Sequence, residues 1–153
     1  MPRVAGRRVV LGIGNPDRGD DAAGREVVQR LRGALPQDVL LAEETGEVVR
    51  ILARIEGAEA AYLIDACASG APPGSVSRFD VAEARLPQHA SAASTHGLGL
   101  AEAIELARAL GQLPTRCIVY AIEGARFEPG ASLSPAVGTA VDEVAQRLRA
   151  ELV

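Results

Sequence analysis

The sequence contains no lysine and no tryptophan, and each absence excludes classes of function. Because all 16 basic residues are arginines, the chain has no P-loop lysine, no Schiff-base lysine and no serine–lysine dyad. Aromatic residues make up 3% of the chain, and the formal net charge is −4. A nucleic-acid-binding protein typically needs a basic surface and stacking aromatic side chains. We therefore expect no nucleic-acid partner.

Cysteines are few, and long apolar runs are absent. The two cysteines, Cys67 and Cys117, form no C-x-x-C pair, which excludes zinc-ribbon and thioredoxin-like sites and leaves core thiols as the expectation. No apolar run approaches the roughly 18 residues of a membrane span, and the start of the chain lacks the cleavage site of a secretory signal. We expect a cytoplasmic protein without a membrane span, in which residues 1–153 form a single domain with its own core.

Apolar runs and helical patterns alternate along the chain. The helical patterns are expected after residues 20–21, at 48–55, from 96 to 110 with a cap at Ser94 or Thr95, and from 135 to 152. Their apolar faces are expected to comprise, in the second, third and last of these helices respectively, Val48, Val49, Leu52 and Ile55; Leu100, Ile104, Ala107 and Leu110; and Val137, Val141, Val144, Leu148 and Leu152. An alternating run at 75–81 suits a strand near the sheet edge that need not be parallel. This order predicts an α/β fold, a three-layer sandwich in which a mostly parallel twisted sheet of about five strands has helices on both faces. Runs typical of buried strands occur at 9–13, 39–42, 60–64 and 117–122, and an acidic loop over 43–47 is expected after the second of them.

The first buried strand runs directly into an acidic turn, VVLGIGNPDRGDDAAG, in which Asp20 and Asp21 open a helix. A helix start favours negative charge, and ligands usually bind at the carboxyl ends of parallel strands. The alternative is an ordinary helix cap, which is the commoner role of an isolated Asp pair. A dinucleotide-binding G-x-G-x-x-G motif is excluded, because Asp17 stands at the position of its third glycine.

Two further polar residues are expected at the same sheet edge. Asp65 follows the buried strand 60–64, although an Asp there can also serve only to bind loop N–H groups. His96 opens a helix, where the dipole favours the neutral, ligating imidazole, and its alternative is a cap or surface residue. Together with Asp20 and Asp21 these residues can form a metal site, whereas Cys67 is expected to be a buried thiol outside it.

Three ordered motifs give the chain a family resemblance. LGIGNPDRGDDAAG, LIDA and STHGLGL resemble the opening, central-strand and histidine motifs of the endopeptidases that mature nickel-iron hydrogenases, and the later segments YAIEG and LSPAV are similar too. The resemblance covers nearly the whole chain. It implies a single hydrogenase maturation protease-like domain over residues 1–153.

The resemblance also implies a reaction and a site. Such an endopeptidase removes the C-terminal tail of the hydrogenase large-subunit precursor after nickel insertion, and the nickel supplied by the substrate is its recognition signal. The family's metal-binding acidic residues and histidine match Asp21, Asp65 and His96, which are therefore the expected catalytic and metal-binding residues. Zinc or cadmium is expected to substitute for nickel in vitro, and the peptidase is expected to be of the metal-dependent or aspartic type.

Two departures from the family pattern stand out. The opening motif commonly has Glu at the position of Asp21 or Gly at that of Ala22, and the loop 44–46 is more acidic than expected. Either departure can mark a subfamily with a different cognate subunit, or a paralogue that no longer cleaves tails. In a metal-assisted hydrolysis, Asp20 or Glu44 are the candidate proton carriers.

Two other functions compete with cleavage. A nickel-binding or chaperone-like partner that docks on the large subunit without cutting it would need the same ligands, and the motifs name no nucleophile that would decide against it. An unrelated small α/β hydrolase is less favoured, because the sequence has no G-x-S-x-G elbow.

Overall fold

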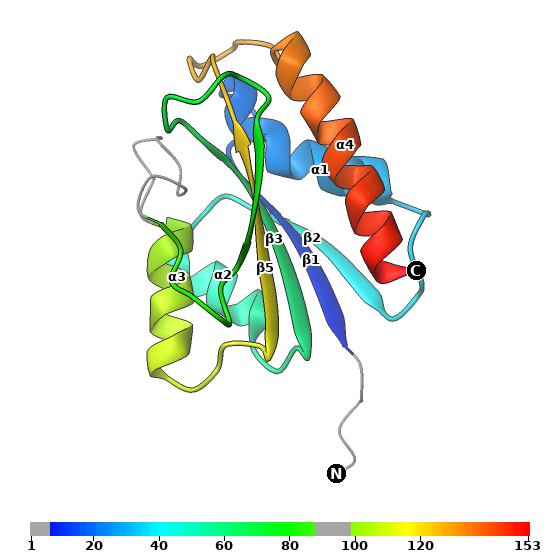
Figure 1. Cartoon of the computed structure of the whole chain (residues 1–153), viewed down its shortest axis with the longest axis vertical. Helices are drawn as coiled ribbons and strands as arrows, with labels where there is room; N and C mark the ends of the chain where they lie inside the picture. Colours follow the sequence, from blue (N-terminus) through cyan, green and yellow to red (C-terminus); the bar gives the residue numbers. More distant parts are fainter. Residues whose placement is uncertain (1–6, 88–98) are drawn as a thin grey trace.

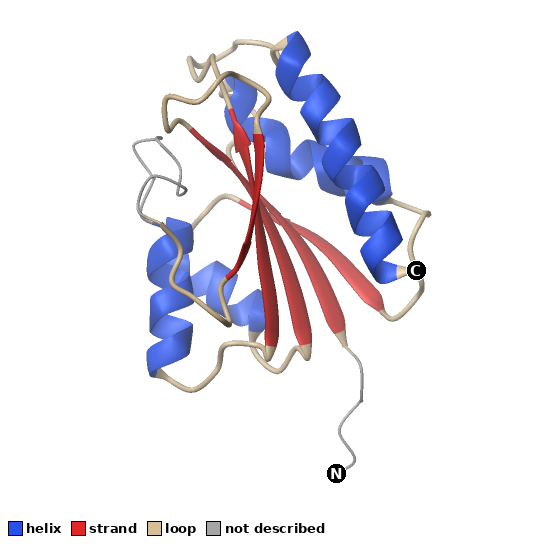
Figure 2. Ribbon diagram, in the orientation of Figure 1, coloured by secondary structure: helices blue, strands red, loops and turns tan. Residues whose placement is uncertain are grey.

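The computed structural model describes residues 7–87 and 99–153, which build one sheet with helices on both of its faces (Figure 1, Figure 2). Among the helices of these residues, none has the length and apolar character needed to cross a membrane. In chain order the elements are β1 (Arg8–Ile13), η1 (Gly19–Ala22), α1 (Ala23–Leu31), β2 (Val39–Glu44), α2 (Val48–Ile55), β3 (Ala60–Cys67), β4 (Val76–Asp80), α3 (Gly99–Ala109), β5 (Arg116–Glu123) and α4 (Pro135–Leu152).

The five strands lie in the order β2-β1-β3-β5-β4. Strands β1, β2, β3 and β5 pair in parallel, and β4 lies antiparallel to β5 at the edge. Helices α1 and α4 cover one face of the sheet, and α2 and α3 cover the other (Figure 2). The predicted α/β sandwich with a mostly parallel five-stranded sheet is confirmed, as is the edge position of β4, whose direction the sequence left open.

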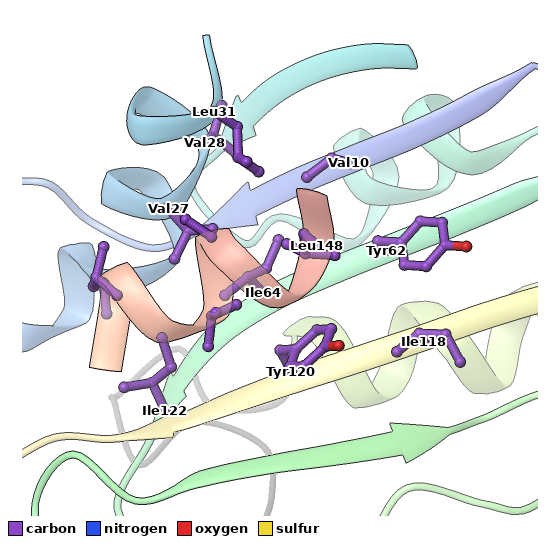
Figure 3. Packing of buried hydrophobic residues seen from close by; sticks show 14 of the residues in the cluster. Val10, Val27, Val28, Leu31, Tyr62, Ile64, Ile118, Tyr120, Ile122 and Leu148 are labelled. Atoms are coloured by element: carbon purple, nitrogen blue, oxygen red, sulfur yellow. The ribbon is translucent and has the colours of Figure 1, made fainter. Parts of the chain in front are cut away.

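Two apolar clusters fill the space on either side of the sheet. Successive side chains of a strand point to opposite faces, so Tyr62 and Ile64 of β3 pack toward α1 and α4, while Ala61 and Leu63 pack toward α2 and α3. Figure 3 shows the first cluster, with α1 and α4 lying over the side chains of the sheet. The stripe predicted for the last helix is confirmed, since all of its members are buried: Val137, Val141, Val144, Leu148 and Leu152.

Some boundaries and faces differ from the sequence prediction. Strand β2 includes Glu43 and Glu44, which were expected in a loop, because arginines neutralise both carboxylates. Helix α2 buries Ile55 as predicted and packs Val48 and Leu52 against the core, but it also buries Ile51 and leaves Val49, predicted on the buried face, 76% exposed. Leu110 was expected on the buried face of α3, but it lies beyond the helix end and is 56% exposed.

Glycine lets α1 begin directly against the ends of two strands. A Cβ at Gly24 would lie 2.2 Å from the backbone oxygen of Ile64 and 2.8 Å from that of Ile13. No other residue type fits such a close approach without a backbone shift. The short helix η1, which precedes α1 and carries Asp20 and Asp21, is therefore held at the carboxyl ends of β1 and β3.

Candidate active site

The site lies where the sheet changes its direction of winding. From β1 the chain passes through α1 to β2 on one side, and α2 then returns it across the opposite face to β3 on the other side. In such sheets, the segments that follow the two central strands diverge and leave a crevice at the carboxyl ends. Pairing between β1 and β3 ends at Gly12 and Ile64, while β3 continues beside β5. Asp65 is thus the first residue of β3 beyond the paired part of β1.

Asp65 is a buried carboxyl group whose ionised form is disfavoured. It is 4% exposed, and its Oδ1 accepts a hydrogen bond of 2.8 Å from the N–H of Ala66. Burial, together with the negative charge of Asp21, raises the pKa of Asp65 well above its ordinary value, and the Ala66 N–H only partly opposes this. The strand was predicted to end before this residue. It continues to Cys67, so Asp65 is held by regular strand backbone.

Asp21 reaches the crevice from η1. It is 4% exposed, and its Oδ2 accepts a hydrogen bond of 2.9 Å from the N–H of Asn15. Gly14, at φ +146°, packs against it so closely that a Cβ there would lie 1.8 Å from the Asp21 backbone oxygen. Because the charge of Asp21 acts on Asp65, the structure brings together two of the three predicted site residues.

The third predicted residue, His96, lies outside the described residues, as do the expected caps Ser94 and Thr95. Gly99, three positions later, is the first residue of α3, and a Cβ there would lie 1.9 Å from the backbone oxygen of Gly46. The loop after β2 and the start of α3 are therefore in contact. Within residues 7–87 and 99–153, no three His, Cys, Asp or Glu side chains are grouped so that they could hold a metal ion.

Asp20 has a structural role. Its fully buried carboxylate accepts four hydrogen bonds, from the N–H groups of Ala125 (2.8 Å) and Arg126 (2.9 Å) and from the N–H and hydroxyl of Ser134 (both 2.7 Å). Burial alone would raise the pKa of Asp20, but these bonds outweigh it and the pKa is lowered. Asp20 therefore anchors η1 to the start of α4, which argues against the expected role as a proton carrier or as a cap of its own helix.

Glu44, the other candidate proton carrier, is enclosed by two arginines. It is 5% exposed, and its oxygens accept hydrogen bonds from Arg50 (3.1 Å) and Arg54 (2.6 Å). Burial alone would raise its pKa, but the bonds from Arg54 and Arg50 outweigh burial and the pKa is lowered. A carboxylate held ionised in this way is poorly suited to accept and pass on a proton.

Cys67 is a buried thiol, as predicted, although it lies close to the site. Burial and the charges of Glu123 and Asp65 raise the pKa of Cys67 to about 12, which suppresses the nucleophilic thiolate. Sequence reasoning missed the role of Glu123. Its carboxylate accepts hydrogen bonds from the N–H (2.8 Å) and hydroxyl (2.5 Å) of Ser69 and so ties the loop after β3 to the end of β5.

Comparisons with known proteins point to one family. A family model described as hydrogenase maturation protease matches residues 28–151, a range that includes Asp65 and His96 but begins after Asp21. The chain is 32% identical over 158 residues to the hydrogenase expression/formation protein HupD of Rhodobacter capsulatus, covering 98% of this chain and 75% of that protein. It is 27% identical over 132 residues to HupD of Thiocapsa roseopersicina, covering 84% and 60%.

Solved structures with the same fold include two maturation proteases. The hydrogenase maturating endopeptidase HybD of Escherichia coli superposes with a TM-score of 0.81 at 24% identity, covering 95% of this chain and 91% of that one. The [NiFe] hydrogenase maturation protease HycI of Thermococcus kodakarensis KOD1 gives a TM-score of 0.70 at 24% identity, covering 95% and 92%. At this level of identity, the similarity shows a shared fold.

Proposed function

The chain belongs to the hydrogenase maturation protease family, and from this premise we propose the reaction and the site. As a member of the family it is a peptidase of hydrogenase maturation. Its proposed substrate is the large-subunit precursor of a nickel-iron hydrogenase, from which it removes the C-terminal tail after nickel insertion. The nickel that the precursor already carries is the proposed recognition signal.

The observation that carries this proposal is the buried pair formed by Asp21 and Asp65. The two carboxylates come from different segments, each 4% exposed, and the charge of Asp21 disfavours ionisation of Asp65. A chain gains nothing in stability from such an arrangement, because like charges repel strongly where water is excluded. A divalent cation that arrives with the substrate would remove the repulsion, so the pair is suited to binding a metal centre.

Each proposed ligand has a distinct task. Asp21 and Asp65 supply two oxygens, and His96 is proposed as a nitrogen ligand from the segment before α3. Three ligands leave coordination positions to the substrate, and carboxylate and imidazole ligands are compatible with nickel, zinc or cadmium. Nickel held there would polarise the carbonyl of the bond to be cut. No described cysteine is assigned as a nucleophile, in agreement with the raised pKa of Cys67.

Cleavage of nickel-loaded and nickel-free precursor tests the proposal. The wild-type chain is incubated with each form of a cognate precursor, and tail loss is measured by mass spectrometry. Only the nickel-loaded form should lose its tail, Asp65→Asn should abolish the loss, and Asp17→Asn, an exposed acidic residue of the same turn, should leave it unchanged. Equal processing of both forms would refute nickel as the signal. Binding of nickel-loaded precursor without tail loss would instead favour the non-cleaving partner.

A further inference from the structure

The two acidic residues at the end of β2 are each held by a different set of side chains. Glu43 accepts hydrogen bonds from three residues of α1 and its C-terminal end, namely Arg25 (3.0 Å), Gln29 (3.4 Å) and Arg32 (2.8 Å). Glu44 is held separately, by arginines of α2. The acidity of the end of β2, which departs from the family pattern, is thus explained by these side-chain partners. Glu43 is also connected to the candidate site, because its partner Arg25 contacts Gly14 as well.

Arg25 connects Glu43 to the turn that surrounds Asp21. Its Nε bonds Glu43, and its Nη1 donates to the backbone oxygen of Gly14 at 3.3 Å. The side chains of Arg25 and Glu43 are only 21% and 15% exposed, so their ion pair is partly shielded from water and salt. Because a guanidinium donates in a fixed planar fork, the bond to Glu43 fixes the direction in which Nη1 points.

The turn at Gly14 and Asn15 is therefore held from three sides. The Gly14 N–H donates to the backbone oxygen of Glu44 at 3.0 Å, the Gly14 oxygen accepts from Arg25 at 3.3 Å, and the Asn15 N–H donates to the Asp21 carboxylate at 2.9 Å. Glycine at φ +146° has wide conformational freedom, so its position depends on such external bonds. Loss of one bond would let the Asn15 N–H, and with it the Asp21 carboxylate, change direction.

We propose that Arg25, oriented by Glu43, is a positioning residue that holds the Asp21 carboxylate in its metal-binding direction through the turn at Gly14 and Asn15. This inference rests on the proposed function, in which Asp21 contacts the substrate's nickel. Groups that orient a metal ligand from behind typically contribute 10–100-fold to metal affinity. Arg25 is expected to act at that scale, although it does not touch the metal.

Arg32 provides a matched control. It also bonds Glu43, at 2.8 Å, and among the described residues its side chain has no other hydrogen-bond partner than Glu43. Arg32→Met therefore removes an arginine and an ion pair with the same carboxylate but leaves the turn at Gly14 intact. Arg25→Met removes the contact with the turn as well.

Cadmium alone, titrated calorimetrically into the full-length chain, is the probe. Arg25→Met should weaken one-site cadmium binding about 10–100-fold, Arg25→Lys should lie between it and the wild type, and Arg32→Met should stay within about twofold of the wild type. The NMR resonance of the Asn15 amide, recorded without metal, should shift in Arg25→Met and stay in place in Arg32→Met. Because Arg25→Lys retains the charge and the aliphatic stem but not the planar fork, a weaker affinity in this variant would not follow from a loss of packing alone.

The outcomes distinguish a failure of the positioning role of Arg25 from a failure of the proposed metal site. If the wild type binds cadmium and Arg25→Met binds it within about twofold of Arg32→Met, the positioning role is wrong and the proposed site stands. If the wild type binds no cadmium, the proposed metal site fails and the positioning role fails with it. An unmoved Asn15 amide in Arg25→Met would also overturn the positioning role, whatever the metal affinity.

Discussion

Replacing Asp65 with asparagine should make the metal-free protein more stable while it abolishes metal binding. The substitution keeps the shape of the side chain, and the asparagine oxygen can still accept the bond from Ala66 that Asp65 accepts at 2.8 Å. It removes a charge that is buried and faces Asp21. Residues selected for a function often reduce stability in this way, and relieving such a defect commonly adds about 0.5–2 kcal/mol to the free energy of unfolding.

The sign of the pH dependence follows from the direction of the pKa shift. The pKa of an aspartate in the unfolded chain is about 3.9, whereas the pKa of Asp65 in the folded protein is well above its ordinary value. As the pH rises between these two values, the unfolded state releases its proton first, so the wild type loses stability. The loss is complete above the folded pKa. Asp65→Asn has no such group, so its advantage should be near zero in acid and full in alkali.

Urea unfolding in the presence of a chelator measures this difference. The free energy of unfolding of the wild type, Asp65→Asn and the exposed-site control Asp17→Asn is compared at about pH 4 and pH 8. At pH 8 the melting temperature of Asp65→Asn should be higher by a few degrees, since about 1 kcal/mol corresponds to roughly 2–4 °C in a domain of this size. An Asp65→Asn variant that is less stable than the wild type at pH 8, with no change toward pH 4, would refute the reasoning.

Two further predictions concern residues that support the site. Asp20→Asn should lower the free energy of unfolding by at least about 2 kcal/mol. Ser134 donates one bond to each oxygen of Asp20, and an asparagine has only one oxygen, so it cannot accept both. Denaturant unfolding measures the loss, and a near-neutral variant would contradict the anchoring role. Gly24→Ala should prevent stable folding, since its Cβ would lie 2.2 Å from a backbone oxygen. Gly138→Ala, where the nearest atom is 3.9 Å away, should instead stabilise α4 by up to about 1 kcal/mol. Circular dichroism of both variants tests the contrast.

The sequence was sufficient to predict the sheet and the sheet edge at which two of the candidate site residues lie. The strand containing Tyr62 to Ile64 is apolar on both faces, which is typical only of a strand covered by helices on both sides, and it proved to be central. The chain alternates strands with helices, which favours parallel pairing. Polar groups that follow parallel strands then meet at one sheet edge, where the charge of Asp21 acts on Asp65.

The supporting contacts could not be predicted, because they join residues that are far apart in the chain. The partners of Asp20 lie 105–114 positions away, and no local pattern marks Ser134 as more than a helix cap. The acidity of Glu43 and Glu44 indicated a loop, whereas arginines from elsewhere in the chain pair with both residues in the strand. In α2, Val49 was predicted on the buried face where the structure has Ile51, since a two-turn helix offers few positions from which to fix its orientation.

The two adjacent aspartates show how hydrogen-bond capacity separates an anchor from a ligand. An ionised carboxylate offers about four lone-pair sites. In Asp20, Oδ2 accepts three hydrogen bonds, from Ala125, Arg126 and the Ser134 hydroxyl, and Oδ1 accepts one from the Ser134 N–H. Both oxygens of Asp20 are thus committed to backbone anchoring. For Asp21, the described residues supply a single hydrogen bond, from Asn15, so its carboxylate retains acceptor sites, and its charge acts on Asp65. Asp20 therefore fixes the backbone, while the Asp21 carboxylate remains available to a metal, which supports Asp21 rather than Asp20 as the ligand.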